Sequence, residues 1–246
     1  MSGIVVSRRD SARLILLDRT EDGGRLKTVD LAALKDALLA PPEYGERAIV
    51  VSGAGQDFCT GRIPDRVTQG VSRSISIGNI AAKPILDVYD AIARAPLPVV
   101  AAVTGKAFGF GCALAGACDV AYASPSAVFA LPELDKGVPP TLAMSALFGR
   151  VARRPLLEWI LSGRQIDASA AQTHGLVDLI VVEPLQHALD LALKLGSVSV
   201  RSLATLKAFL NASIDSARPA QRLLAGELIG LSLSEDEAQD PALVRK

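Results

Sequence analysis

The strongest constraint on the fold is a stretch in which a buried strand, a glycine-rich turn and a buried helix follow one another. Residues 99–103 (VVAAV) are apolar and rich in valine, which is typical of a strand covered on both faces. The turn over residues 105–111 contains three glycines, and residues 112–118 (CALAGAC) predict a helix buried on nearly all sides. This order directs the N–H groups of a helix start at a ligand, either a bound anion or an oxyanion that forms during a reaction.

A second stretch of the same kind precedes the first. Residues 48–52 (AIVVS) predict a buried strand, which leads into the glycine-rich segment 53–62. If the two strands are neighbours, the backbone N–H groups of Arg62 and Phe110 converge on one oxygen. Two such donors make an oxyanion hole, in which the loss of one donor typically costs about 2.7–4 kcal/mol of transition-state stabilisation. The turn at 105–111 matches neither the dinucleotide nor the P-loop pattern, so a nucleotide phosphate site is not expected.

The rest of the chain predicts an α/β protein with a helical tail. Strand patterns alternate with helix patterns as far as residue 184, and only helix patterns follow. We therefore expect a core over residues 1–184 and a helical oligomerisation region over residues 185–246. The polar segment 66–78 is expected to be a mobile loop over the site. The predicted strands are 4–7, 12–18, 48–52, 99–103, 119–123 and 176–182, and the predicted helices before the tail are 29–39, 82–93, 112–118, 141–148, 154–161 and 168–174.

Composition and charge argue against several classes of partner. The formal net charge is zero and the Lys and Arg residues are dispersed, which argues against nucleic acid. The sequence has no run of about 18 apolar residues that could span a bilayer, and its N-terminus lacks the layout of a signal peptide. Cys59, Cys112 and Cys118 lie in apolar surroundings and are expected to be reduced, packed thiols of a cytoplasmic protein. Because no cluster of possible ligands has metal-binding spacing, no metal is expected.

Glu133 is the candidate acid or base of the central region. Apart from Cys and Tyr, the ionisable side chains between residues 96 and 134 are Lys106, Asp119 and Glu133. A carboxylate that follows residues 129–132 (FALP) is either an exposed residue at a strand end or a partly desolvated base with a raised pKa. The pattern leaves both interpretations open. Asp119, which lies between a predicted helix and a predicted strand, is expected to make structural hydrogen bonds.

Taken together, several segments resemble the crotonase (enoyl-CoA hydratase/isomerase) superfamily. The resemblance is carried by segments 48–61, 103–111, 118–123, 129–140 and 161–177, and by Lys207, where a C-terminal helix of the family often has lysine. It implies a crotonase-like spiral of ββα units followed by helices that build a homotrimer, often doubled to a homohexamer. It also implies acyl-CoA thioesters as substrates, with no metal or redox cofactor.

The resemblance also assigns roles to individual residues. Arg62 and Phe110 match the family's oxyanion-hole donors through their backbone N–H groups, and Glu133 matches the second of two glutamates that flank the thioester in a typical hydratase. The position of the first glutamate, two residues after Gly111, is Ala113 in this chain. The turn and substrate-binding positions are Gly61, Gly109, Gly111 and Ala113.

Three departures from the family pattern concern the pocket and the CoA contacts. Family members frequently have glycine or a small residue where this chain has Arg62 and Phe110, so the two side chains are expected to reshape the pocket. Ile63 stands in place of an acidic residue, and residues 26–28 (LKT) replace the usual Asn-Ala-Leu. Both lie near the expected CoA nucleotide site, so the family's CoA contacts do not transfer to this sequence.

Three functions remain open at this stage. With Glu133 as the one carboxylate, the preferred hypothesis is an isomerase that moves a proton from C2 of a 3-enoyl-CoA to C4. A hydratase would have to recruit another acid such as Asp135, which shares a face with Glu133 if the segment is extended. A non-catalytic acyl-CoA-binding protein is the third hypothesis. Relatives with one acid also decarboxylate or cleave C–C bonds, so the reaction class is not fixed by the resemblance.

Overall fold

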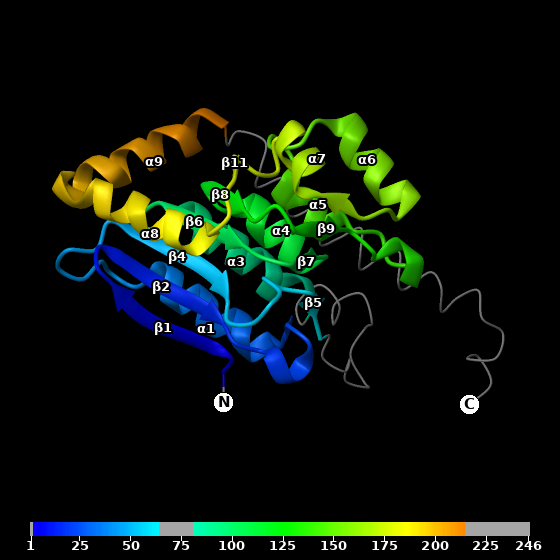
Figure 1. The fold of residues 1–246 in the computed structure, drawn as a ribbon, viewed down its shortest axis with the longest axis horizontal. Helices are drawn as coiled ribbons and strands as arrows, with labels where there is room; N and C mark the ends of the chain where they lie inside the picture. Colours follow the sequence, from blue (N-terminus) through cyan, green and yellow to red (C-terminus); the bar gives the residue numbers. More distant parts are fainter. Residues whose placement is uncertain (1, 64–80, 215–246) are drawn as a thin grey trace.

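The computed structural model describes residues 2–63 and 81–214. Its main element is a six-stranded sheet with strand order β1-β2-β4-β6-β8-β11 (Figure 1). The first strand pairs antiparallel with the second, and every other neighbouring pair is parallel. The strands are β1 (Ile4–Arg9), β2 (Ala12–Leu17), β4 (Ala48–Gly53), β6 (Val99–Val103), β8 (Val120–Ala123) and β11 (Leu179–Ile180).

Both faces of this sheet are covered, which explains the continuous apolar runs in its central strands. Alternate side chains, such as Val99 and Ala101 of β6, belong to a large core. That core is shared with helices α1 (Thr28–Leu39), α3 (Lys83–Arg94) and α4 (Phe110–Ala117). The intervening Val100 and Ala102 point to the other face, where they pack in a smaller core with helix α8 (Pro184–Lys194). Figure 1 shows α8 across β4 and β6, on the opposite side of the sheet from α1. The predicted strand at residues 99–103 is therefore confirmed.

The helices and short 3-10 turns connect and cover the strands. Most of them agree with the predicted ranges to within one or two residues, including the amphipathic helix predicted at 82–93. The helices are α1 (Thr28–Leu39), α3 (Lys83–Arg94), α4 (Phe110–Ala117), α5 (Thr141–Leu147), α6 (Arg153–Ser162), α7 (Ala168–Thr173), α8 (Pro184–Lys194) and α9 (Val200–Ile214), and the 3-10 turns are η1 (Thr20–Asp22), η3 (Leu134–Lys136) and η4 (Leu195–Ser197).

Short strands form a second layer that the sequence pattern did not predict. Strands β7 (Lys106–Phe108), β9 (Val128–Ala130) and β10 (Ile166–Asp167) form one small sheet, and β3 (Arg25–Leu26) pairs with β5 (Gly61–Arg62). Cys59 forms a β-bridge with Ala107, so the segment that leads into β5 adjoins β7. The segment predicted as a glycine-rich turn therefore contains strand β7, and α4 begins two residues earlier than expected. The strand predicted at 176–182 is limited to the two residues of β11.

Helix α9 is held on the core by an ion pair between a buried lysine and a partly buried aspartate. Lys207 is 6% exposed, and its Nζ lies 2.6 Å from Oδ2 of Asp119. The same carboxylate oxygen accepts a hydrogen bond of 2.8 Å from the N–H of Val99 at the start of β6. Asn211 adds a 2.7 Å hydrogen bond from Nδ2 to the carbonyl of Ala93 at the end of α3. The predicted structural role of Asp119 is confirmed.

The described residues bear on the domain boundary in one respect. Helix α8, the first element of the predicted oligomerisation region, is part of the smaller core, where Ala188 and Ala192 are fully buried. The division at residues 184 and 185 stays a prediction, as does the mobile loop at 66–78, all of which lies outside the described residues. Within the described part of the chain, no helix is both long enough and apolar enough to cross a membrane.

Candidate active site

The two glycine-rich turns lie against each other, as the sequence requires for a shared oxyanion site. The N–H of Phe108 donates to the carbonyl of Cys59 at 2.9 Å, and the N–H of Cys59 donates to the carbonyl of Lys106 at 3.1 Å. A Cβ on Gly111 would overlap the carbonyl of Cys59. Glycine at position 111 therefore allows the start of α4 to lie directly on the segment before β5.

The hydrogen bonds next to Arg62 and Phe110 constrain the directions of the two predicted donors. The N–H of Ile63 donates to the carbonyl of Leu26 at 2.8 Å, so the preceding N–H, that of Arg62, points away from β3 because successive N–H groups of a strand alternate in direction. The first hydrogen bond of α4 runs from the N–H of Ala113 to the carbonyl of Gly109, at 3.0 Å. The N–H of Phe110 thus lies in the opening turn of α4, before that bond, with the positive end of the helix dipole behind it.

The side chains of the two residues are occupied elsewhere. Arg62 donates from Nη1 to the Thr28 hydroxyl at 3.1 Å, at the start of α1. The Phe110 ring stacks on that of Tyr89 from α3, with centroids 6.0 Å apart and an angle of 15° between the planes. Each side chain is therefore anchored on a neighbouring helix. The role predicted for the two residues at the junction is that of their backbone N–H groups. Tyr89 was not identified from the sequence, where it is one aromatic residue in an amphipathic helix pattern.

Glu133 reaches the same junction from the segment after β9. It caps the short 3-10 turn η3, and an added Cβ on Gly109 would lie 2.8 Å from its Oε1. Its other carboxylate oxygen, Oε2, is buried and has no hydrogen-bond partner among the described residues. Gly109 itself has φ +53° and ψ −114°, and its N–H donates to the carbonyl of Ala130 at 2.8 Å. The turn therefore depends on glycine both for its backbone conformation and for the close approach of Glu133.

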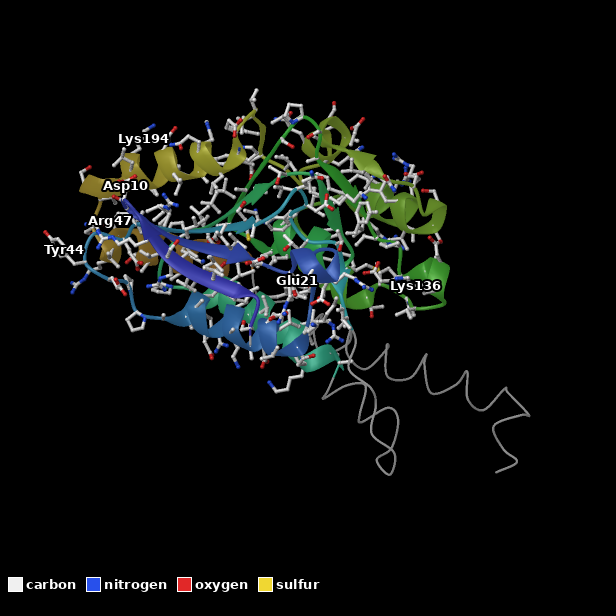
Figure 2. The ribbon with its side chains drawn as sticks, turned by 60° about the horizontal axis from the view of Figure 1, so that its bottom comes forward. Asp10, Glu21, Tyr44, Arg47, Lys136 and Lys194 are labelled. Atoms are coloured by element: carbon white, nitrogen blue, oxygen red, sulfur yellow. The ribbon has the colours of Figure 1, made fainter. Side chains whose placement is uncertain are left out.

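Burial raises the pKa of Glu133 above its ordinary value of 4.5, an effect that its own backbone N–H and the charge of Lys136 partly oppose. Figure 2 shows Lys136 at the outer edge of the molecule, at the opposite end from Asp10 and Lys194. Of the two interpretations left open by the sequence, the structure agrees with the partly desolvated carboxylate. A carboxylate with a raised pKa accepts a proton more readily, which is what a general base requires.

No second acid accompanies Glu133 at the positions considered from the sequence. Ala113 is fully buried on α4 and offers a methyl group. Asp135 lies within η3, so the segment is turned rather than extended, and the expectation of a face shared with Glu133 is wrong. The Asp135 carboxylate is exposed and lies beside the α6 terminus, where its Oδ1 is 3.2 Å from an added Cβ on Gly163.

The cysteines do not supply a nucleophile. All three are free and buried. Burial raises the pKa of Cys59 and of Cys118 to about 12, and it also raises the pKa of Cys112, to which the nearby charge of Glu133 adds. The prediction of packed thiols is confirmed. Across residues 2–63 and 81–214, no group of three or more His, Cys, Asp or Glu side chains is arranged to hold a metal ion.

Comparisons with known proteins place this chain among its relatives. The sequence matches the enoyl-CoA hydratase/isomerase family over residues 30–242. It is 32% identical over 216 residues to a probable enoyl-CoA hydratase of Rhizobium meliloti, covering 86% of this chain and 82% of that protein. It is 27% identical over 244 residues to enoyl-CoA hydratase domain-containing protein 3, mitochondrial, of Rattus norvegicus, covering 97% and 81%. A crystal structure of an enoyl-CoA hydratase/isomerase from Mycobacterium paratuberculosis superposes with a TM-score of 0.80 at 26% identity, covering 95% of this chain and 94% of that one.

Proposed function

This chain belongs to the enoyl-CoA hydratase/isomerase family, and from that premise we propose that it is a double-bond isomerase acting on 3-enoyl-CoA thioesters. The α/β fold and the crotonase architecture expected from the sequence are confirmed by the solved relatives. Membership makes the chain an acyl-CoA enzyme of the hydratase/isomerase type. Which of the two reactions it performs is the subject of the proposal.

The proposed reaction uses one carboxylate and two backbone donors. Glu133 removes a proton from C2 of the 3-enoyl thioester, and the electron pair moves onto the thioester oxygen to give an enolate. The N–H groups of Arg62 and Phe110 bind that oxygen, where a single donor is typically worth about 2.7–4 kcal/mol. The enolate then collapses as protonated Glu133 returns the proton to C4, and the double bond moves from C3–C4 to C2–C3. No atom is gained or lost, and Glu133 ends in its starting form.

The observation that carries this proposal is the pairing of Glu133 with Ala113. Adding water to a 2-enoyl thioester requires one group to position and deprotonate the water while a proton is delivered to C2. A typical hydratase, as the resemblance implies, divides that work between two glutamates. In this chain the position of the first holds a buried methyl group, and Asp135 faces α6 instead of the junction. A proton shuttle from C2 to C4 needs one base.

Hydratase activity is the second candidate, because the similar proteins from Rhizobium meliloti and Rattus norvegicus carry hydratase names. In that case the water would have to be activated by Glu133 with a group other than Asp135. The third candidate is a non-catalytic acyl-CoA-binding protein, which would bind the thioester at the same junction without transferring a proton.

The test compares the purified wild-type protein with Glu133→Gln on a 3-enoyl-CoA and on crotonyl-CoA. The wild type should isomerise the first faster than it hydrates the second, and Glu133→Gln should lose isomerisation by a factor of about 100 or more, the usual contribution of a general base. Asp135→Asn is the matched control and should keep the activity. Faster hydration than isomerisation would favour the hydratase, and tight binding of both thioesters without turnover would favour the binding protein.

The remaining properties are proposed on the family premise. Proton transfer between two carbons needs no metal or redox cofactor, so we propose none beyond the coenzyme A moiety of the substrate. A homotrimer or homohexamer and a cytoplasmic location are also proposed. Light scattering on the full chain would test the oligomeric state. Fractionation of cells would test the location, for which the mitochondrion is the alternative because one similar protein is named as mitochondrial.

A further inference from the structure

The face of α4 that presents Phe110 is turned toward α3. Phe110, Ala113 and Ala117 lie three and four residues apart, so they share one side of the helix. Helices α3 and α4 pack against each other, and the contact includes the parallel stack of Tyr89 on Phe110. Glu133 lies against Gly109, the residue that precedes the first residue of α4.

This aromatic pair leaves no exposed surface at the position of the missing acid. Tyr89 is 1% exposed, Phe110 is 6% exposed and Ala113 is fully buried. A small polar cavity lies farther along the two helices, lined by residues that include Tyr89, Ala93, Ala117 and Arg150. Since Tyr89 lines that cavity and also stacks on Phe110, the ring pair stands between the cavity and the start of α4.

The same residue that forms this wall supplies one of the proposed oxyanion donors. The Cβ of Phe110 is two covalent bonds from its own N–H, so the ring begins next to the thioester oxygen that the N–H would bind. At the same junction, Oε2 of Glu133 is buried and unpartnered among the residues that the structure describes, and Oε1 lies against Gly109, the residue next to Phe110. The reacting carbons would therefore lie close to both the buried carboxylate and the aromatic pair.

We propose that the Tyr89–Phe110 pair is a wall that keeps water from the reacting carbons and from protonated Glu133, and that Phe110 thereby selects internal proton transfer over exchange with water and over hydration. This inference rests on the proposed function, because it concerns the fate of the proton that Glu133 removes. It makes Phe110 a specificity-determining residue through its side chain, in addition to the role of its backbone N–H.

The experiment follows the proton in D2O. Wild type, Phe110→Leu and Phe110→Ala convert a 3-enoyl-CoA to product, and mass spectrometry measures the solvent deuterium in the product and any 3-hydroxyacyl-CoA formed. Both substitutions keep the N–H, and the leucine variant keeps an apolar side chain in case the alanine variant does not fold. Tyr122→Leu is the matched control, because Tyr122 is 7% exposed and makes an edge-on ring contact with His187 in the smaller core, on the other face of the sheet.

The expected result is little solvent deuterium in the wild-type product and several-fold more with Phe110→Leu or Phe110→Ala, while Tyr122→Leu matches the wild type. Equal incorporation of solvent deuterium in the wild type and in the folded Phe110 variants would overturn the proposal that the ring pair excludes water. Full incorporation of solvent deuterium by the wild type would overturn it as well. If the wild type does not isomerise the 3-enoyl-CoA, the proposed function fails. The role of the Tyr89–Phe110 pair in excluding water is then tested by measuring hydration of crotonyl-CoA. A gain of hydration in a Phe110 variant over an inactive wild type would support the wall, whereas hydration by the wild type, or by none of the proteins, would overturn it.

Discussion

Replacing Gly109 by alanine tests whether the turn is built to admit Glu133. An added Cβ would lie 2.8 Å from Oε1 of Glu133, which is 0.6 Å short of the 3.4 Å where ordinary van der Waals contact begins. The carboxylate must therefore move, or the turn must open. We expect Gly109→Ala to damage catalysis more than it damages the fold.

The expected magnitude follows from the geometry. A displacement of about 1 Å at a catalytic group can cost about 100-fold in rate, so a forced shift of 0.6 Å or more predicts a loss of roughly 10- to 100-fold in kcat. The backbone contributes a separate penalty, because φ +53° with ψ −114° is unfavourable for any residue with a Cβ. Such strain costs about 1–3 kcal/mol of unfolding free energy.

The assay measures kcat for 3-enoyl-CoA isomerisation and the free energy of unfolding in urea for the same preparations. Gly23→Ala is the matched control, because Gly23 has φ +65° and an added Cβ there meets nothing within 4 Å. That variant should lose stability without losing activity. Full activity in folded Gly109→Ala would refute the placement of Glu133 against this turn.

Two further predictions follow from the charged groups. Because burial raises the folded-state pKa of Glu133, isomerase activity should fall as the pH drops through that raised pKa, which a pH–rate profile measures. Above that pKa, Glu133→Gln should have a higher free energy of unfolding than the wild type, because the buried charge is absent. This gain in stability should disappear below pH 4.5, where the carboxyl group is protonated in both the folded and the unfolded state, and melting curves at several pH values measure it. Lys207→Met removes the cation beside the Asp119 carboxylate, which is 26% exposed, so the docking of α9 should weaken by about 1–2 kcal/mol. Amide exchange across residues 200–211 should then be faster than in the exposed control Lys194→Met.

The elements that could be predicted from the sequence are those whose own pattern of apolar residues and helix-ending residues specifies a strand or a helix. Five consecutive apolar residues at 99–103 specify a strand buried on both faces, and Pro96 and Pro98 mark the end of the helix that precedes it. The two- and three-residue strands around the site have no such pattern. Strand β5, at Gly61 and Arg62, exists because β3 lies beside it, so its signal is in the pairing and not in its residues.

The site shows the same division. The spacing of the glycines and the single carboxylate point to Glu133 and to the N–H groups of Arg62 and Phe110. The partner of the Phe110 ring, Tyr89, lies 21 positions earlier and could not be found without the packing of α3 on α4. The failure at Asp135 has the opposite cause, because a local assumption of extended structure was replaced by a 3-10 turn.

The most direct test of the central claim, that Glu133 acts alone as the proton shuttle, uses a 3-enoyl-CoA labelled with deuterium at C2. The wild-type enzyme in ordinary water should deliver a substantial part of that deuterium to C4 of the 2-enoyl product, and Glu133→Gln should form no product that carries deuterium at C4. Product that contains only solvent hydrogen at C4, or label transfer that persists in Glu133→Gln, would contradict a single carboxylate that removes and returns the same proton.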